Sequence, residues 1–142
     1  MSGEIIVGIG TDGSGTAAAL YGASLASRLH VGLVLVFGYE SSALAPGRGP
    51  LEDQIESIGD ELTGEVRSAI ASAHPDVKVD VELVRDRPAE SLIRVAEARA
   101  AEMIVVGHGG AGPLRAALLG STTYELVHRG PAPILVVPDT DE

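Results

Sequence analysis

The residues best suited to chemistry in this sequence are glycines and a serine that follow an apolar run, in the stretch VVGHGGAGPLRAALLGST at 105–122. Gly107, Gly110 and the pair Gly120-Ser121 have the spacing G-x2-G-x9-G-S. Glycine has no Cβ and adopts positive φ readily, so such a loop lets a ligand approach the backbone and can turn successive N–H groups toward an anion. A helix beginning at Ser121 would add its own free N–H groups and its dipole. The spacing therefore predicts a phosphate-binding loop rather than an ordinary turn.

Side chains in the same stretch could add contacts to a phosphate chain. The hydroxyl of Ser121, with Thr122 or Thr123, can bond a phosphate oxygen or a bound Mg²⁺ ion. Arg115 is the only arginine or lysine in the stretch, and it is a further candidate. The predicted phosphate contacts are Gly107, Gly109, Gly110, Arg115, Gly120, Ser121 and Thr122.

The distribution of charge favours a small anionic ligand over a nucleic acid. The chain has a net charge of −10, one Phe and three Tyr, whereas nucleic-acid binding needs a basic face and usually stacking aromatic side chains. No Asp or Glu occurs from Gly13 to Tyr39 or from Met103 to Tyr124. Burial explains part of this pattern, because buried segments exclude charge, but it does not explain the loop glycines of the second window. We expect an anion to lie between the two segments.

Several other kinds of site are not predicted. The absence of cysteine excludes disulfides and Cys-ligated zinc. The only lysine, Lys78, lies in a predicted strand, so there is no Walker A loop, and no G-x-S-x-G marks a nucleophilic serine. Metal-ligand spacing is missing among the four histidines, which are His30, His74, His108 and His128.

A rival motif lies near the N-terminus. Gly8, Gly10 and Gly13 form a G-x-G-x-x-G pattern between a predicted strand and a predicted helix, as in a dinucleotide-binding fold. Gly8 and Gly10 fall inside the strand rather than in the turn, and the chain has no room for a separate substrate domain. The pattern is kept as an alternative only.

Apolar runs alternate with amphipathic stretches along the chain, and these elements must position the glycine loop. Buried strands are predicted at 4–10, 31–37, 103–106 and 134–137, and a strand with one solvated face, typical of a sheet edge, at 77–84. Helices are predicted from about 16 to 30, with Asp12 or Ser14 as the cap, and at 51–74, 85–102 and 121–128. This alternation predicts one α/β domain over residues 1–142, an open five-stranded and mainly parallel sheet with helices on both faces. The glycine loop follows the fourth strand, where such sheets bind ligands.

The chain resembles the universal stress protein family. The resemblance rests on IVGIGTDGSG near the N-terminus, the RPAESL segment, the MIVVG strand, the glycine spacing and the closing PAPILVVP, and it covers essentially the whole chain. It implies a five-stranded Rossmann-like fold of the adenine nucleotide alpha hydrolase-like type. It also implies that a member with this glycine pattern binds ATP, or in some cases AMP or cyclic AMP.

The same resemblance implies where the nucleotide lies. Thr11 and Asp12 would lie against the adenosine end, and the backbone around Gly38 would meet the adenine edge. Val106 and Gly107 would touch the ribose and the α-phosphate. The other phosphates would be held by Gly109, Gly110, Gly120, Ser121 and Thr122.

We expect the protein to act as a nucleotide-dependent stress-response switch with slow or no turnover, in which the long 38–50 loop responds to occupancy. Fast phosphoryl transfer needs dedicated metal ligands and a positioned nucleophile, and the phosphate loop itself contains no carboxylate base. The main alternative is a weak ATPase or an autophosphorylating protein with Ser121 or a neighbouring threonine as the acceptor. Another alternative is a dimeric scaffold whose site stays empty.

The last predicted strand favours a homodimer. It lies between two prolines, carries no charge and would end the sheet, and a bare edge is normally protected. Pairing with a second copy across a two-fold axis would protect it, as the resemblance also implies, and shielding by the acidic tail is the alternative. The predicted dimer edge consists of Ile134, Leu135, Val136 and Val137.

The N-terminal stretch MSGEIIVGIG lacks the basic region and the apolar length of a signal peptide. No apolar run reaches the length of a membrane span. We therefore expect a soluble cytoplasmic protein.

Overall fold

The computed structural model describes residues 3–10, 15–39, 50–107 and 120–138, with the backbone only for residues 50–56 and 58. Strands and helices alternate throughout these ranges. In chain order they are β1 (Ile5–Ile9), α1 (Thr16–Leu29), β2 (Leu33–Tyr39), α2 (Pro50–Ala73), β3 (Val79–Arg85), α3 (Pro88–Arg99), β4 (Met103–Gly107), α4 (Ser121–Arg129) and β5 (Ile134–Val137).

The strands form one sheet in the order β3-β2-β1-β4-β5, and every neighbouring pair is parallel. The strand order reverses between β1 and β4, because the chain first builds outward through β2 and β3 and then returns to the other side of β1. The prediction of a five-stranded parallel sheet is confirmed. The strand predicted to have one wet face, β3, lies at an edge, as expected.

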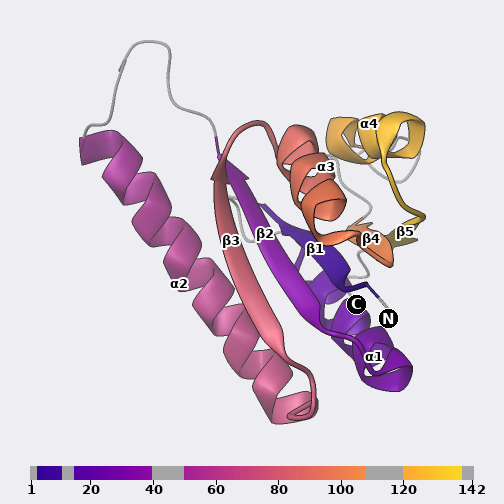
Figure 1. Ribbon diagram of the computed structural model, residues 1–142. Helices are drawn as coiled ribbons and strands as arrows, with labels where there is room; N and C mark the ends of the chain where they lie inside the picture. Colours follow the sequence, from indigo (N-terminus) through magenta and orange to yellow (C-terminus); the bar gives the residue numbers. More distant parts are fainter. Residues whose placement is uncertain (1–2, 11–14, 40–49, 108–119, 139–142) are drawn as a thin grey trace.

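Helices cover both faces of the sheet, as Figure 1 shows. The core on one face joins α1 and α2 to strand side chains such as Ile5, Val7 and Leu35. The core on the other face joins α3 and α4 to the alternate side chains, such as Ile6, Val36 and Ile104. Strands buried on both faces read as continuous apolar runs, which is why their positions are visible in the sequence.

Several bounds differ from the predictions by a few residues, including those of α3, which begins at Pro88 because Arg85 belongs to β3. Two of the differences have a clear cause. Helix α1 begins at Thr16 with Gly15 at its N-cap, so neither Asp12 nor Ser14 caps it. The cause is local: Gly15 has φ +101°, and a Cβ there would lie 2.5 Å from the carbonyl oxygen of Gly8. Strand β2 also continues to Tyr39, because it pairs with β3 along its whole length. None of the helices in the described ranges is long and apolar enough to cross a membrane.

Candidate functional site

A crevice is expected at the carboxyl ends of β1 and β4, where the strand order reverses. The pairing of these two strands ends early, at Val7 with Val105. In contrast, β1 stays paired with β2 as far as Ile9, and β4 stays paired with β5 as far as Gly107. The last two residues of β1 and β4 therefore have no register partner across this junction. The two strands part from each other at the point where the topology predicts a ligand.

Gly107 lies at the end of β4 and has open space beside it. A Cβ built on Gly107 would meet no heavy atom within 4 Å in the described part of the chain. The described neighbours would therefore tolerate a Cβ at Gly107. At Gly15, in contrast, a Cβ would clash with the Gly8 carbonyl. Val106 differs, because its side chain is buried in the core under α3 and α4, which leaves only its backbone for a ligand.

The start of α4 presents main-chain donors. Gly120 is the N-cap in an extended conformation, no side chain of the described residues caps the helix, and its first turn contains no acid. The first bond inside the helix runs from the Tyr124 N–H to the Gly120 carbonyl, at 2.9 Å. Among the described residues, no acceptor faces the N–H groups of Ser121 and Thr122. The side chain of Ser121 is exposed and that of Thr122 half-buried, so both hydroxyls are accessible.

Thr123 joins this helix start to the end of β4. Its hydroxyl donates to the Gly107 carbonyl at 3.3 Å, and the residue is 2% exposed. Two elements that the glycine loop separates in the sequence are thereby brought side by side. Thr123 was an alternative phosphate-binding hydroxyl in the sequence analysis, and the structure assigns it this internal contact instead.

Helix α1 starts beside the carboxyl end of β1, because Gly15 packs on the carbonyl of Gly8. The first turn of α1 contains no acid. The two acid-poor segments of the sequence thus contain the starts of α1 and α4. These helices begin near the ends of β1 and β4. Gly8 itself lies inside β1, where a Cβ would lie 3.0 Å from Leu92, so it forms no part of a phosphate-binding turn.

Gly38 lies one residue before the end of β2 and faces α3. A Cβ on Gly38 would lie 2.5 Å from the Ser91 hydroxyl and 3.1 Å from the Pro88 Cα. Close packing of the α3 start on β2 therefore requires glycine at this position. The proposed adenine contact of Gly38 would involve its backbone, and that contact stays a prediction. Five predicted contacts lie outside the described residues, namely Thr11, Asp12, Gly109, Gly110 and Arg115.

An ion-pair network, here called the α3–α4 clamp, joins the start of α3 to the body of α4. It consists of Arg87 at the N-cap of α3 and Glu90 in α3, with Glu125 and Arg129 from α4. The hydrogen bond from Arg87 lowers the pKa of Glu125 and also raises the pKa of Arg87. The hydrogen bond to Glu90 raises the pKa of Arg129. Glu90 and Glu125 are thus each paired with both arginines.

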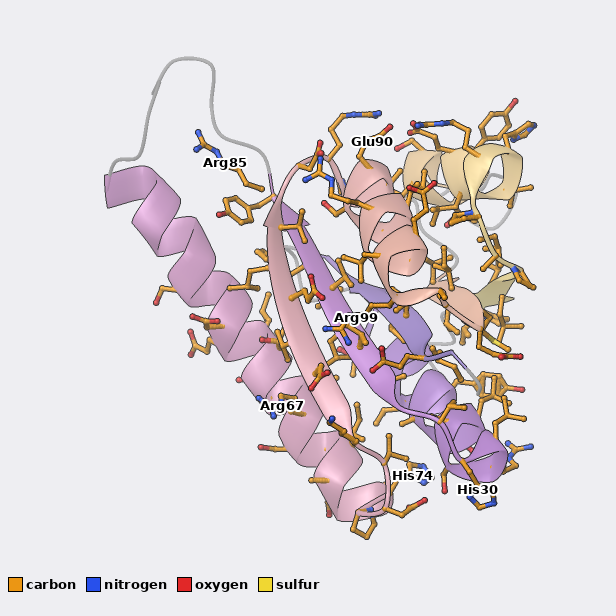
Figure 2. The ribbon with its side chains drawn as sticks, in the orientation of Figure 1. His30, Arg67, His74, Arg85, Glu90 and Arg99 are labelled. Carbon is orange, nitrogen blue, oxygen red and sulfur yellow. The ribbon has the colours of Figure 1, made fainter. Side chains whose placement is uncertain are left out.

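A second network lies toward the opposite end of the sheet, where Arg99 reaches across from the end of α3 (Figure 2). Its guanidinium lies 3.0 Å from Glu4 in the approach to β1, and 3.2 and 2.7 Å from Asp80 and Glu82 in β3. Partial burial lowers the pKa of Arg99, but the bonds to the three carboxylates outweigh it and raise the pKa above its ordinary value. Sequence reasoning missed this cluster, because its members are far apart in the chain.

The histidines do not form a metal site in the part of the chain that the structure describes. His30 and His74 lie at the lower end of the molecule in Figure 2, away from the labelled Arg85 and Glu90. His128 contacts Tyr124 within α4. No group of three or more His, Asp or Glu side chains in the described ranges could hold a metal ion.

Comparison with protein families gives a match over residues 1–138 to the model described as "Universal stress protein family". Among curated proteins, a universal stress protein of Mycolicibacterium smegmatis is 30% identical over 133 residues, which cover 94% of this chain and 45% of the relative. Universal stress protein Rv2624c of Mycobacterium tuberculosis is 33% identical over 135 residues, with 94% and 47% covered. The chain thus spans less than half the length of these relatives.

Solved structures share the fold over nearly the whole chain. A universal stress protein family member from Burkholderia pseudomallei has a TM-score of 0.71 and 26% identity, with 96% of each chain covered. A universal stress protein solved in complex with cAMP has a TM-score of 0.74 and 21% identity, with 96% of this chain and 98% of that chain covered. One from Archaeoglobus fulgidus in complex with dAMP has a TM-score of 0.69 and 18% identity, with 96% of each covered.

Proposed function

Because this chain belongs to the universal stress protein family, we propose that it binds an adenine nucleotide with its phosphates in the crevice between β1 and β4. The observation that carries the proposal is the position of the first α4 N–H groups, which have no acceptor among the described residues, beside a pair of strands that part early. A helix start without acids or a capping side chain attracts phosphate through its amides and its dipole. Two of the similar structures are complexes with the adenine nucleotides cAMP and dAMP, which supports the same class of ligand here.

The proposed nucleotide is ATP, with Mg²⁺ entering as the nucleotide complex. The exposed hydroxyl of Ser121 suits a phosphate oxygen or the metal, since it does not cap α4. The described residues contain no three-ligand metal cluster, so the phosphates would supply most of the ligands of the ion. Gly109, Gly110 and Arg115 would complete the phosphate contacts, and Thr11 and Asp12 would lie at the adenosine end.

We propose slow or no hydrolysis and a regulatory role. Glu125 is the first acid of α4, and Arg87 and Arg129 engage it, which makes it a poor general base. A weak ATPase or an autophosphorylating protein is the second candidate, favoured by the exposed Ser121 hydroxyl at the helix start. Incubation with γ-labelled ATP and Mg²⁺ separates the two, because label retained on the protein or many turnovers per minute would contradict a switch.

We also propose a homodimer in which β5 pairs with its copy. The strand lies at the edge of the sheet, beyond β4, and its four residues are only half-buried in the single chain. A second copy would satisfy the open edge.

Gly107→Val tests the proposed binding site. A Cβ at Gly107 meets no heavy atom of the described residues within 4 Å, whereas the valine side chain would displace a ligand phosphate from that space. Mass spectrometry should detect an adenine nucleotide released by denaturation of the wild-type protein. Calorimetry should show at least about tenfold weaker ATP binding by the variant, which corresponds to a loss of about 1.4 kcal/mol.

Gly64→Ala is the matched control, because Gly64 in α2 also has open space but lies away from the crevice. It should bind ATP as the wild type does. Circular dichroism establishes that both variants fold. Undiminished ATP affinity in folded Gly107→Val would overturn the proposed location.

A further inference from the structure

Helix α4 has few buried attachments to the rest of the molecule. Thr123 and Leu126 are its buried side chains. Leu126 lies in the core under α3 and fixes the middle of the helix, whereas Thr123 lies in the first turn and reaches the end of β4. Within the described residues, Thr123 is thus the buried contact that joins the α4 start to the end of β4.

The chain contains a second buried threonine in a helix, and it behaves differently. The hydroxyl of Thr63 in α2 donates to the Gly59 carbonyl at 2.9 Å, one turn back in its own helix. This is the ordinary bond of a threonine inside a helix. Thr123 is equally buried, at 2% exposed, but it lies in the first turn of α4, where its own helix has no carbonyl four residues back, and its hydroxyl donates to Gly107 sixteen residues earlier. The same group serves a local bond in α2 and a tertiary bond in α4.

A further attachment of α4 is the α3–α4 clamp, which consists of exposed ion pairs. Arg87 and Arg129 are about half exposed, at 50% and 47% of their side chains. Ion pairs at such positions contribute little to stability and are screened by salt. The α4 residues in these pairs, Glu125 and Arg129, follow the first turn that contains Ser121 and Thr122. Among the described contacts, the clamp thus engages the body of the helix, whereas Thr123 engages its first turn.

We infer that Thr123 is a positioning residue, whose hydroxyl bond to the Gly107 carbonyl holds the first amides of α4 in the geometry that binds a nucleotide phosphate. The inference rests on the proposed function. A displacement of about 1 Å is enough to weaken hydrogen bonds from fixed donors to an anion. Loss of the Thr123 hydroxyl should thus weaken the binding of the phosphate and leave the binding of the nucleoside unchanged.

The experiment compares adenosine with AMP, because the ratio of their dissociation constants isolates the contribution of the phosphate. Thr123→Val keeps the shape of the side chain and removes the hydroxyl. We expect this variant to lose about tenfold in AMP affinity, the effect of one hydrogen bond to a charged group, while adenosine affinity changes less than about twofold. Thr123→Ser, which keeps the hydroxyl, should restore the ratio.

Thr63→Val is the matched control, since it removes a buried hydroxyl of the same kind from α2. It should lower the melting temperature without changing the AMP-to-adenosine ratio. An unchanged ratio in Thr123→Val, or an equal loss in Thr63→Val, overturns the inference. If Thr123→Val does not fold, Thr123→Ala replaces it, with the same expected ratio.

Hydrogen exchange of the ligand-free protein tests the inference apart from the proposed function. The Tyr124 amide, whose bond to the Gly120 carbonyl is the first in the helix, should exchange faster in Thr123→Val than in the wild type, while α2 is unchanged. If exchange becomes faster but the wild type binds neither adenosine nor AMP, the proposed function is refuted. The structural role of the bond between Thr123 and Gly107 would then still hold. Unchanged exchange would refute the positioning role itself.

Discussion

Gly59 of α2 lies directly against the ring of Phe37 in β2. A Cβ on Gly59 would come within 2.5 Å of the Cδ2 and Cε2 atoms of a ring that is fully buried. Phe37 pairs in register with Ile9, the last residue of β1. The close approach of α2 to β2 thus lies beside the strand ends that border the proposed site, and it depends on the absence of a single methyl group.

Gly59→Ala should destabilise the protein by about 1–3 kcal/mol, because the added methyl overpacks the core at Phe37. Gly64→Ala in the same helix is the control, since its Cβ meets nothing within 4 Å. That change should stabilise the protein by about 0.5–1 kcal/mol through the better helix propensity of alanine. Urea unfolding of both variants measures the difference, and similar stabilities would contradict the packing described.

Arg99→Ala should destabilise the protein by about 1–3 kcal/mol, because it leaves Glu4, Asp80 and Glu82 close together without their cation. The Arg99 side chain is only 26% exposed, so water replaces the lost contacts incompletely. Arg94→Ala is the control: Arg94 is 63% exposed and pairs with Asp86 alone, and its loss should cost less than about 1 kcal/mol. If denaturant unfolding gave the same loss of unfolding free energy for both variants, the Arg99 cluster would contribute no more to stability than an exposed ion pair.

The α3–α4 clamp should make stability depend on pH in the acid range. The hydrogen bond from Arg87 lowers the pKa of Glu125 in the folded state below its ordinary value of 4.5. A lowered folded-state pKa contributes stability above the unfolded value, and this contribution is lost as the pH falls through the folded value. Glu125→Gln should therefore melt below the wild type at pH 7, and the gap should close as the pH falls below about 4.5.

Glu97→Gln is the control for that experiment, because it removes the same charge from the exposed surface of α3. It should not melt below the wild type at pH 7. A melting-temperature gap for Glu125→Gln that stays constant from pH 7 to pH 3 would show that the lost charge is not the cause.

Val136→Pro should convert the proposed dimer into a monomer. The Pro133 carbonyl accepts from Ile104 in β4, so alternation along β5 directs the N–H of Val136 to the open edge of the sheet. Proline removes that N–H and is tolerated in an edge strand. A charge at Val136 would be a poorer test, because its side chain packs against the core under α3 and α4. Analytical ultracentrifugation reads the outcome, and a wild type that is already monomeric would rule out the dimer.

The order and the kind of the elements could be predicted from the sequence. The last strand was predicted at its observed bounds, Ile134–Val137, because prolines flank a short apolar run. The helix start at Ser121 was also predicted, from a glycine followed by a hydroxyl residue. The bounds of α1 and β2 were less accurate, since a close contact at Gly15 and pairing with β3 determined them.

The candidate site could be predicted in part. The glycine spacing indicated that the end of β4 and the start of α4 act together, and the fold brings them side by side through Thr123 and Gly107. The contact of Thr123 with the Gly107 carbonyl could not be predicted, because a hydroxyl in a pattern of phosphate-binding residues gives no sign that it is buried. Gly38 and Gly59 likewise gave no sign of the side chains that pack on them.

The sequence by itself determined the α/β class, the alternation of strands and helices, and the place of the glycine motif after the fourth strand. These follow from hydrophobic periodicity and from local backbone preferences, which neighbouring residues set. Only the tertiary structure decided that β1 and β4 part early, that Thr123 bonds Gly107, and that Arg99 joins β1 to β3. Such contacts depend on strand register and helix packing between residues far apart in the chain, and no local pattern encodes them.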